Sequence, residues 1–244
     1  MILAAGKGTR MAGATVTPMP KVIIPLGDKP VVQHLLHEVE KIETSTPPIL
    51  VVGYESEKVK AVLGDKYLYA LQVEQKGSGH AVLAGKDLVT AENFLVLNGD
   101  MPFITSTSLR KLIDAHESTN SKVSMITGRL PNYEGVYQHF NSFGRIIRDI
   151  EGHIEKIQEY LDCTDDQKQI TEVNSGEYMF NSEWLWPHLE KIGSHNAQGE
   201  VYLTDIIELA INDGQNIQTL EVEPEELYGI NTPDHLDHAK SIIK

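Results

Sequence analysis

The sequence of 244 residues contains a single cysteine, Cys163. One cysteine cannot form an intramolecular disulfide, and it cannot supply a cysteine-rich zinc cluster. A chain without disulfides is typical of a reducing compartment, so we expect a cytoplasmic protein.

The chain also lacks an excess of basic residues and any long apolar run. Lys and Arg number 21 against 35 Asp and Glu, which gives a formal net charge of −14. Nucleic-acid-binding proteins usually carry a basic field, so we expect neither a nucleic acid nor a membrane as a partner. No apolar run approaches the roughly 20 residues of a membrane span. Lys7 and Arg10 follow the short apolar start instead of preceding it, unlike the basic residues of a signal peptide.

In the first half, apolar β-branched runs alternate with segments of helical spacing. The all-apolar runs at 49–53 and 94–97 are typical of buried parallel strands. The alternation predicts βαβ units and an α/β fold with a doubly wound, mostly parallel sheet. The expected strands are 1–4, 49–53, 68–73 and 94–97, and the expected helices are 31–39, 55–63 and 79–88.

From about residue 121 the strand candidates become shorter and fewer helices separate them. We interpret this half as an antiparallel addition to the same, therefore mixed, sheet. No Pro/Ser-rich linker or charge block marks a boundary, so we expect one domain over 1–244, with halves of about 1–120 and 121–231 and a closing helix in 232–244. The expected strands here are 123–127, 144–148, 154–158 and 173–180, and the expected helices are 182–192 and 204–213.

A glycine-rich loop, LAAGKGTRM at 3–11, follows the first strand. Glycines at such a place let the backbone approach a ligand and point N–H groups at phosphate oxygens. Arg10 and Lys21 would add the positive charge that a triphosphate requires. The spacing fits neither the P-loop nor the dinucleotide fingerprint. The alternative is a flexible glycine turn with solvated basic side chains.

Asp100 closes the triplet Asn-Gly-Asp after the apolar strand 94–97. Open α/β sheets bind ligands beyond the carboxyl ends of their strands. A carboxylate there, without a nearby histidine or cysteine set, suits a hard cation such as Mg²⁺ shared with phosphates. The alternative is an aspartate that caps the following loop.

The segment QVEQKGSGHA at 72–81 combines side-chain amides with a Gly-Ser-Gly helix start. An amide carries a donor and an acceptor together, so it can pair with the edge of a nucleobase. The first N–H groups of a helix are further donors. His80, at the helix start, is expected to be structural.

These segments, read in order, resemble the sugar-1-phosphate nucleotidylyltransferases. The motifs are LAAGKGTRM, PKV, QxxQxGSGHA, NGDMP, FGRI, EVNSG, NAQGEVYLTD and GINT, and they span residues 3–231. The opening loop alone is shared by the whole superfamily, whereas NAQGEVYLTD at 196–205 points to the N-acetylglucosamine uridylyltransferase branch. The resemblance implies a Rossmann-like nucleotidyltransferase fold that binds the nucleotide with its first half and the sugar with its second.

The resemblance also implies a role for each matching residue. Arg10, Lys21 and Asp100 would be catalytic, and Asp100 and Asn231 would ligate Mg²⁺. The nucleotide would be bound by Leu3, Ala4, Ala5, Gly6, Lys7, Gly8, Gln72, Gly77 and Ser78. The sugar would be bound by Gly144, Glu159, Asn174, Tyr202 and Thr204.

The expected reaction forms UDP-N-acetylglucosamine and pyrophosphate from UTP and N-acetylglucosamine 1-phosphate. A phosphate monoester has a second pKa of about 6, so the attacking group is already ionised and no protein nucleophile is needed. Two alternatives remain: a different hexose 1-phosphate or nucleotide, or a non-catalytic protein that binds a nucleotide sugar. The sequence leaves the oligomeric state open.

The sequence departs from the family pattern at three places. Leu161 stands where the family has a basic residue near the sugar. Residues 13–19 lengthen the loop before Lys21, either as a lid or as a tolerated insertion. No hexapeptide repeats of a left-handed β-helix are present, so we expect no acetyltransferase domain.

Two other segments are expected to be solvated surface. The acidic run at 223–226 is interpreted as an exposed turn, and His235 and His238 as a pair on a helix surface.

Overall fold

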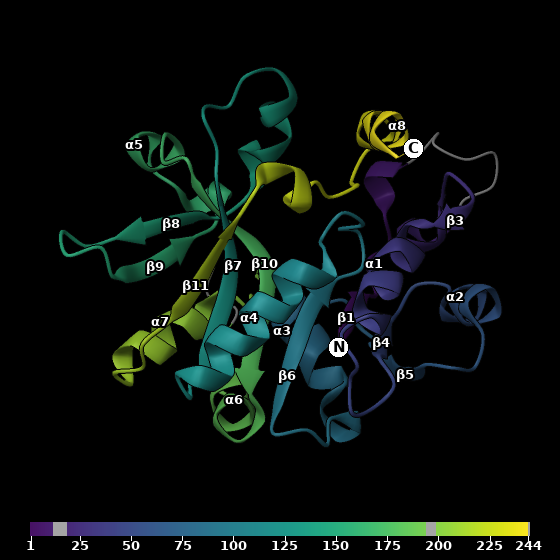
Figure 1. Ribbon diagram of the computed structural model, residues 1–244, viewed down its shortest axis with the longest axis horizontal. Helices are drawn as coiled ribbons and strands as arrows, with labels where there is room; N and C mark the ends of the chain where they lie inside the picture. The colour runs from purple at the N-terminus through teal and green to yellow at the C-terminus, as the bar shows by residue number, and fades with distance from the viewer. Residues whose placement is uncertain (12–18, 194–198, 244) are drawn as a thin grey trace.

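The computed structural model describes residues 1–11, 19–193 and 199–243 (Figure 1). The strands are β1 (Ile2–Ala4), β2 (Pro25–Leu26), β3 (Lys29–Pro30), β4 (Ile49–Val52), β5 (Leu68–Leu71), β6 (Asn93–Asn98), β7 (Val123–Arg129), β8 (Arg145–Arg148), β9 (Ile154–Gln158), β10 (Glu172–Asn181) and β11 (Gln218–Val222). The helices are α1 (Val31–Glu40), α2 (Ser56–Leu63), α3 (Ser78–Ala84), α4 (Ser106–Ser118), α5 (Asp165–Lys168), α6 (Ser182–Leu189), α7 (Asp205–Asn212) and α8 (Pro233–Ile242).

One mixed sheet runs through the described residues in the order β11-β7-β10-β6-β1-β4-β5. Strands β1, β4, β5 and β6 are parallel, whereas β10 is antiparallel to both of its neighbours, β6 and β7. The hairpin of β8 and β9 continues from β10. The predicted fold class, a mostly parallel α/β sheet with an antiparallel addition, is confirmed. Helix α4 and strand β11 were not predicted.

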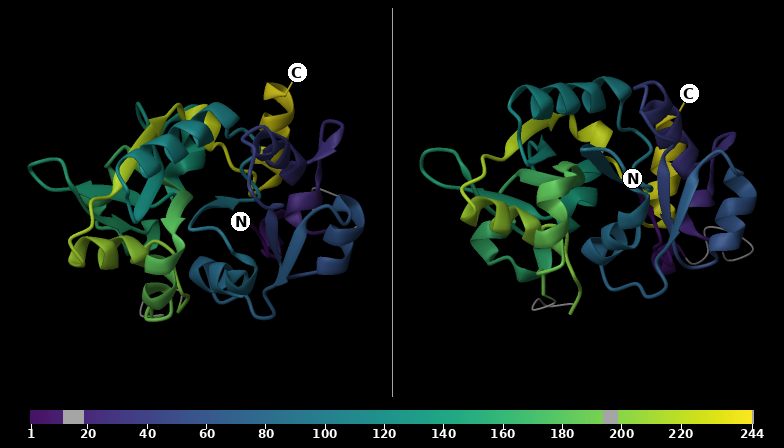
Figure 2. Two further views of the ribbon diagram at one scale, coloured as in Figure 1. Left: turned by 60° about the horizontal axis from the view of Figure 1, so that its bottom comes forward. Right: turned by 90° about the horizontal axis from the view of Figure 1, so that it is seen from below.

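Helices cover both faces of this sheet. On one face, α4 packs on β7 and β11 and also contacts α1. On the other face, α3 packs on β1 and β4 and contacts α6, which in turn contacts α7. The views of Figure 2 show these two sets on opposite sides of the sheet, as in a doubly wound fold. Helix α8 lies beside the N-terminal part of the chain, where it contacts β2 (Figures 1 and 2).

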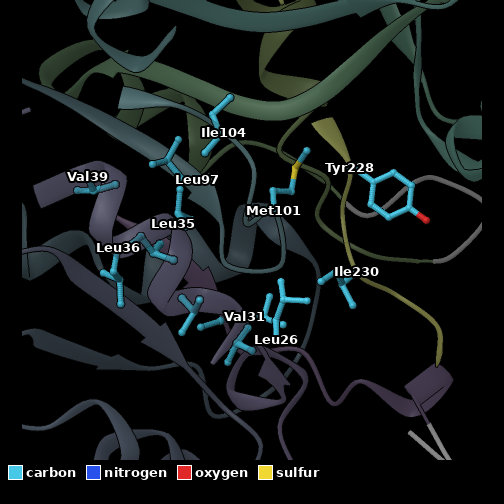
Figure 3. Close-up of a cluster of buried hydrophobic side chains, with 14 of the residues drawn as sticks. Leu26, Val31, Leu35, Leu36, Val39, Leu97, Met101, Ile104, Tyr228 and Ile230 are labelled. Carbon is cyan, nitrogen blue, oxygen red and sulfur yellow. The ribbon is translucent and has the colours of Figure 1, made fainter. Parts of the chain in front are cut away.

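The largest hydrophobic core lies between α1 and the sheet (Figure 3). Buried α1 side chains such as Leu35 pack with Leu97 at the end of β6 and with Met101 in the loop that follows. Ile230 joins the same cluster from a distant part of the sequence, and its N–H donates to the carbonyl of Asp100 (2.9 Å). Burying each large aliphatic side chain contributes roughly 1.5–3 kcal/mol. This packing therefore holds the loop after β6 against residues 229–231.

The acidic segment at 223–226 is exposed at Glu223 and Glu225, but Glu226 is not a solvated side chain, because it binds the N-cap residue of α4. One of its carboxylate oxygens accepts hydrogen bonds from the N–H (3.0 Å) and Oγ1 (2.9 Å) of Thr105, and the other accepts from Oγ of Ser108 (2.9 Å). Thr105 is the N-cap of α4, and its Oγ1 accepts the N–H of Ser108 (3.2 Å). The Glu226 carboxylate holds this cap residue in place and complements the helix dipole at the N-terminus of α4. The prediction failed because only the tertiary fold brings Glu226 to α4.

We expect Glu226→Ala to lower the free energy of unfolding by about 1–2 kcal/mol, because it removes the carboxylate that accepts hydrogen bonds from Thr105, the N-cap of α4, and from Ser108. Urea unfolding of the variant and the wild type measures the difference. Glu225→Ala is the matched control: Glu225 is exposed, so this change should stay within about 0.5 kcal/mol. Equal effects of the two variants would contradict the capping role.

Among the described residues, no helix is long and apolar enough to cross a membrane.

Candidate functional site

The carboxyl ends of three parallel strands meet at one edge of the sheet. Ala4 of β1 lies opposite Val52 of β4, and Leu3 lies opposite Asn98 of β6. The glycine-rich loop and the turn carrying Asp100 therefore leave the sheet side by side. Because β10 is antiparallel, its first residues reach the same edge, and they carry the sugar-binding candidate Asn174.

The two candidate metal ligands converge on one ammonium group. Nζ of Lys21 donates hydrogen bonds to Oδ2 of Asp100 and to Oδ1 of Asn231 (2.7 Å). Arg10 also donates to Oδ1 of Asn231 (3.3 Å). A carboxylate oxygen and an amide oxygen within reach of one cation are the donor set that Mg²⁺ accepts. Asp100 and Asn231 therefore fit a divalent ion as ligands. The ammonium group of Lys21 lies between these two side chains.

The nucleotide-binding candidates line two connected pockets. The first, of about 300 Å³, is lined by Leu3, Ala4, Ala5, Gly6, Lys21, Gln72, Gly77, Ser78 and Asp100 among the predicted residues. The second, of about 400 Å³, is lined by Gly6, Lys7, Gly8, Arg10, Lys21 and Asn231. Gly6 and Lys21 belong to both, so the base-side candidates and the phosphate-side candidates form one continuous surface.

Local packing explains the segment at 72–81. Nε2 of Gln72 donates to the carbonyl of Gly77 (3.2 Å) and contacts Nδ1 of His80 (3.0 Å), so His80 orients Gln72. Gly77 has a φ of +104°, and a Cβ there would lie 2.5 Å from the carbonyl oxygen of Val201. This position thus requires glycine. Oγ of Ser78 accepts the N–H of Leu203 (3.0 Å), which joins this motif to the one ending at 205.

The sugar-binding candidates line a third pocket, of about 250 Å³. Gly144, Glu159 and Asn174 line it together with Asp100 and Asn231. Thr204 does not line this pocket, but its Oγ1 donates to Oε1 of Glu159 (2.9 Å). Tyr202 does not line the pocket either. The metal-ligand candidates therefore lie where the nucleotide side and the sugar side meet.

Two acidic residues, Asp100 and Glu159, line this third pocket, and the charges of Asp205 and Asp162 act on Glu159. Burial raises the pKa of Glu159, the Thr204 hydrogen bond opposes this, and the nearby charges of Asp205 and Asp162 raise the pKa further. Burial also raises the pKa of Asp205 to about 6, with additional contributions from Glu208 and Asp162.

We expect Asp205→Asn to stabilise the protein at pH 7 but not at pH 4. The folded state keeps the Asp205 proton up to about pH 6, whereas the unfolded chain loses it near 3.8. The contribution of the Asp205 carboxyl to the free energy of unfolding is therefore fully present below about pH 4 and is lost as the pH rises through about 6. For this half-exposed carboxyl we expect a gain on the order of 1 kcal/mol at pH 7, after allowing for solvent screening. Urea unfolding of both proteins at the two pH values tests this, and a pH-independent difference would contradict it.

Several residues that line the pockets were not predicted to have a role. Asn98 lines both the nucleotide pocket and the sugar pocket, and Gln75 lines both nucleotide pockets. Both lie inside predicted motifs, Asn98 two residues before Asp100 and Gln75 three residues after Gln72, and this closeness could have identified them. Ser175 and Gly176 also line the sugar pocket, because β10 ends there.

The interpretation of His235 as helix surface is wrong. Its Nε2 lies 3.1 Å from Nδ1 of His139, and its Nδ1 lies 3.3 Å from the backbone nitrogen of Asn231, which donates to it. Burial lowers the pKa of His235 and lowers that of His139 to about 3, so both rings are neutral near pH 7. The pair therefore supports the segment that carries Asn231, because α8 packs back onto the site.

Some predicted features lie elsewhere. Residues 13–18 of the lengthened loop and 196–198 of the NAQGEVYLTD motif lie outside the described residues. Leu161 is 63% exposed. A separate, mostly apolar pocket of about 310 Å³ lies at the opposite ends of β1, β4 and β6, and it contains none of the predicted site residues.

This chain is similar over its whole length to curated bifunctional proteins. All of this chain aligns with the bifunctional protein GlmU of Enterococcus faecalis (37% identical over 246 residues) and with that of Geobacillus sp. (39% over 251 residues). The chain spans 51% of each, about half the length of these curated relatives.

Solved structures share the fold at lower identity. UDP-glucose pyrophosphorylase complexed with UDP-glucose superposes with a TM-score of 0.74 at 17% identity, covering 99% of this chain and 96% of that one. HddC from Yersinia pseudotuberculosis superposes with a TM-score of 0.70 at 18% identity, covering 100% and 98%. At these identities the likeness shows the fold alone.

A family match extends over most of the chain. Residues 1–225 match the family described as Nucleotidyl transferase. This stretch includes the glycine-rich loop, Lys21, Asp100 and every sugar-side candidate. We conclude that the chain belongs to the nucleotidyl transferase family.

Proposed function

We propose that this chain transfers a uridylyl group from UTP to N-acetylglucosamine 1-phosphate, with Mg²⁺, forming UDP-N-acetylglucosamine and pyrophosphate. The observation that supports this most directly is the position of Asp100 and Asn231. Asp100 lines both the base-side pocket and the sugar pocket, and Asn231 lines both the phosphate-side pocket and the sugar pocket. Two phosphorylated substrates bound in these pockets would meet at this pair.

In this reaction an oxygen of the sugar phosphate attacks the α-phosphorus of UTP, and the bond to the β-phosphate breaks. The attacking phosphate is already ionised near pH 7, because its second pKa is about 6. Catalysis then rests on in-line positioning and on neutralising the charge of the phosphates. Arg10 and Lys21 supply positive charge, and Asp100 and Asn231 would hold Mg²⁺, which when bound neutralises further phosphate charge.

The hydrogen bonds already made within the chain support the proposed nucleotide contacts. Nε2 of Gln72 is directed at Gly77 and His80, which leaves its Oε1 to accept a hydrogen bond from a base. Uracil has an N–H on its pairing edge where cytosine has an acceptor, so this favours uridine. The backbone from Leu3 to Gly8 and Gly77 to Ser78 would bind the remaining parts of the nucleotide, with Lys7 near its phosphates.

The sugar contacts are proposed for Gly144, Glu159 and Asn174, supported by Tyr202 and Thr204. The choice of N-acetylglucosamine rests on the NAQGEVYLTD motif and on the similarity to the GlmU proteins. One observation favours the alternative of another hexose 1-phosphate. Leu161 is exposed where the family pattern has a basic residue, so a cation near the sugar is missing.

A pyrophosphate-release assay over a matrix of nucleoside triphosphates and sugar 1-phosphates tests the proposal. We expect turnover to be fastest with UTP and N-acetylglucosamine 1-phosphate. Turnover only with dTTP or glucose 1-phosphate would overturn the choice of substrates. No turnover with any pair, in folded protein that binds a UDP-sugar, would replace the enzyme by a non-catalytic binding protein.

A further inference from the structure

A buried carboxyl group stands behind the turn that carries Asp100. Glu177 of β10 is completely inaccessible to solvent, and no basic side chain among the described residues pairs with it. Its Oε1 accepts the N–H of Asn98 (3.3 Å), and its Oε2 accepts Nδ2 of Asn98 (3.1 Å). A buried carboxyl is costly without hydrogen-bond donors, and both donors here come from this single asparagine.

An irregularity in β10 aims Glu177 at Asn98. Between residues 174 and 178, β10 advances four positions while its partner β7 advances two. Oγ of Ser175 stabilises this bulge by accepting the N–H of Glu177 (3.0 Å) and donating to the carbonyl of Ile126 (2.8 Å). Gly176 takes a φ of +82° within it. Such bulges re-aim side chains next to active sites.

The amide of Asn98 is thereby fixed in one orientation. Its Nδ2 donates to Glu177 and also to the carbonyl oxygen of Gly176 (3.2 Å). A backbone carbonyl can only accept, so the nitrogen faces the protein. Oδ1 of Asn98 has no hydrogen-bond partner among the described residues, and Asn98 lines both the nucleotide pocket and the sugar pocket.

We propose that Glu177 is a positioning residue for the transfer reaction: it holds the Asn98 amide so that Oδ1 accepts a hydrogen bond from the ligand where the two pockets meet. This inference rests on the proposed function. Glu177 acts through Asn98 and does not touch the ligand. Its two acceptor oxygens matter, not its volume, because glutamine at 177 would turn an NH₂ group toward a donor of Asn98.

Steady-state kinetics of Glu177→Gln and Asn98→Ala, with calorimetric binding of UDP-N-acetylglucosamine, test the proposal. We expect each variant to raise the KM of at least one substrate about tenfold and to weaken product binding by a similar factor, with a much smaller change in kcat. The double variant should resemble Asn98→Ala alone, because residues that act through one contact are not additive. Thermal unfolding shows that each variant is folded.

Glu172→Gln is the matched control. Glu172 is a second buried carboxylate on β10, but it pairs with Arg129 and Arg148 and lines none of the three pockets of the candidate site. This variant should lose stability and keep wild-type KM values. If all three single variants shifted KM alike, a general disturbance of β10 would replace the proposed role.

Several results would overturn the inference. Wild-type KM and product affinity in Glu177→Gln would do so, as would full additivity in the double variant. If Glu177→Gln does not fold, Asn98→Ala tests the inference by itself. Product affinity in Asn98→Ala equal to that of the wild type would exclude a contact between Asn98 and the ligand and would overturn the inference. A wild-type protein without turnover or UDP-sugar binding would overturn the proposed function and this inference together, whereas an active wild type with an unaffected Glu177→Gln overturns this inference alone.

Discussion

Asp100→Ala is expected to lower turnover by about a thousandfold, equivalent to about 4 kcal/mol of transition-state stabilisation, while the protein remains folded. Asp100 is the carboxylate that meets Asn231 at a single cation position, and it lines two of the three pockets. Without Asp100, the Mg²⁺ that would neutralise the phosphates would lose its carboxylate ligand. Pyrophosphate release and thermal unfolding measure the two parts of this expectation.

A metal-binding measurement separates this role from simple disturbance of the site. Mn²⁺ as a probe, followed by electron paramagnetic resonance, should bind the wild type and not Asp100→Ala. Asp114→Ala is the control, because Asp114 lies exposed on α4. It should retain both activity and Mn²⁺ binding. Near-normal turnover in Asp100→Ala would remove this residue from the metal site.

Lys21→Met is expected to reduce turnover about a hundredfold and, in the absence of nucleotide, to strengthen Mn²⁺ binding severalfold. The ammonium of Lys21 donates to the same two oxygens that would ligate the metal. It therefore competes with a divalent ion for Asp100 and Asn231 and also repels that ion. Titration of Mn²⁺ against the apo variant and the apo wild type measures the change.

Lys7→Met provides the matched comparison for this experiment. Lys7 lines the phosphate-side pocket but makes no hydrogen bond to either metal-ligand candidate. Its removal takes away the same charge, so Mn²⁺ affinity should change little if direct competition is the cause. Mn²⁺ binding that is unchanged or weaker in Lys21→Met would contradict the competition.

Most strands of this protein could be predicted because their signals are local. The uninterrupted apolar run of β4 and the boundaries of β9 follow from residue type and spacing alone. Helix α4 was not predicted although its sequence carries a signal, because Leu109 and Leu112 have helical spacing behind the N-cap Thr105. Strand β11 alternates only between half-buried and exposed residues, so its pattern is weak.

The antiparallel addition was predicted from the shorter strands of the second half, which have fewer helices between them. The irregularity of β10 had no local signal. The bulge that turns Glu177 toward Asn98 depends on pairing with β7, which lies far away in the sequence. The hydrogen bond of Glu226 with the N-cap residue of α4 and the support that His235 gives to Asn231 depend on tertiary packing in the same way.

The amino-acid sequence by itself determined the alternation of strands and helices, the glycine-rich loop suited to phosphate binding and the positions of the charged residues. These features depend on residue types and on spacing along the chain. Only the tertiary structure decided that Lys21, Asp100 and Asn231 share one cation position. That contact depends on β6, the segment before α8 and the helical turn at Lys21–Ile23 packing into a common core, and the free energy of that packing comes from the whole assembly of side chains.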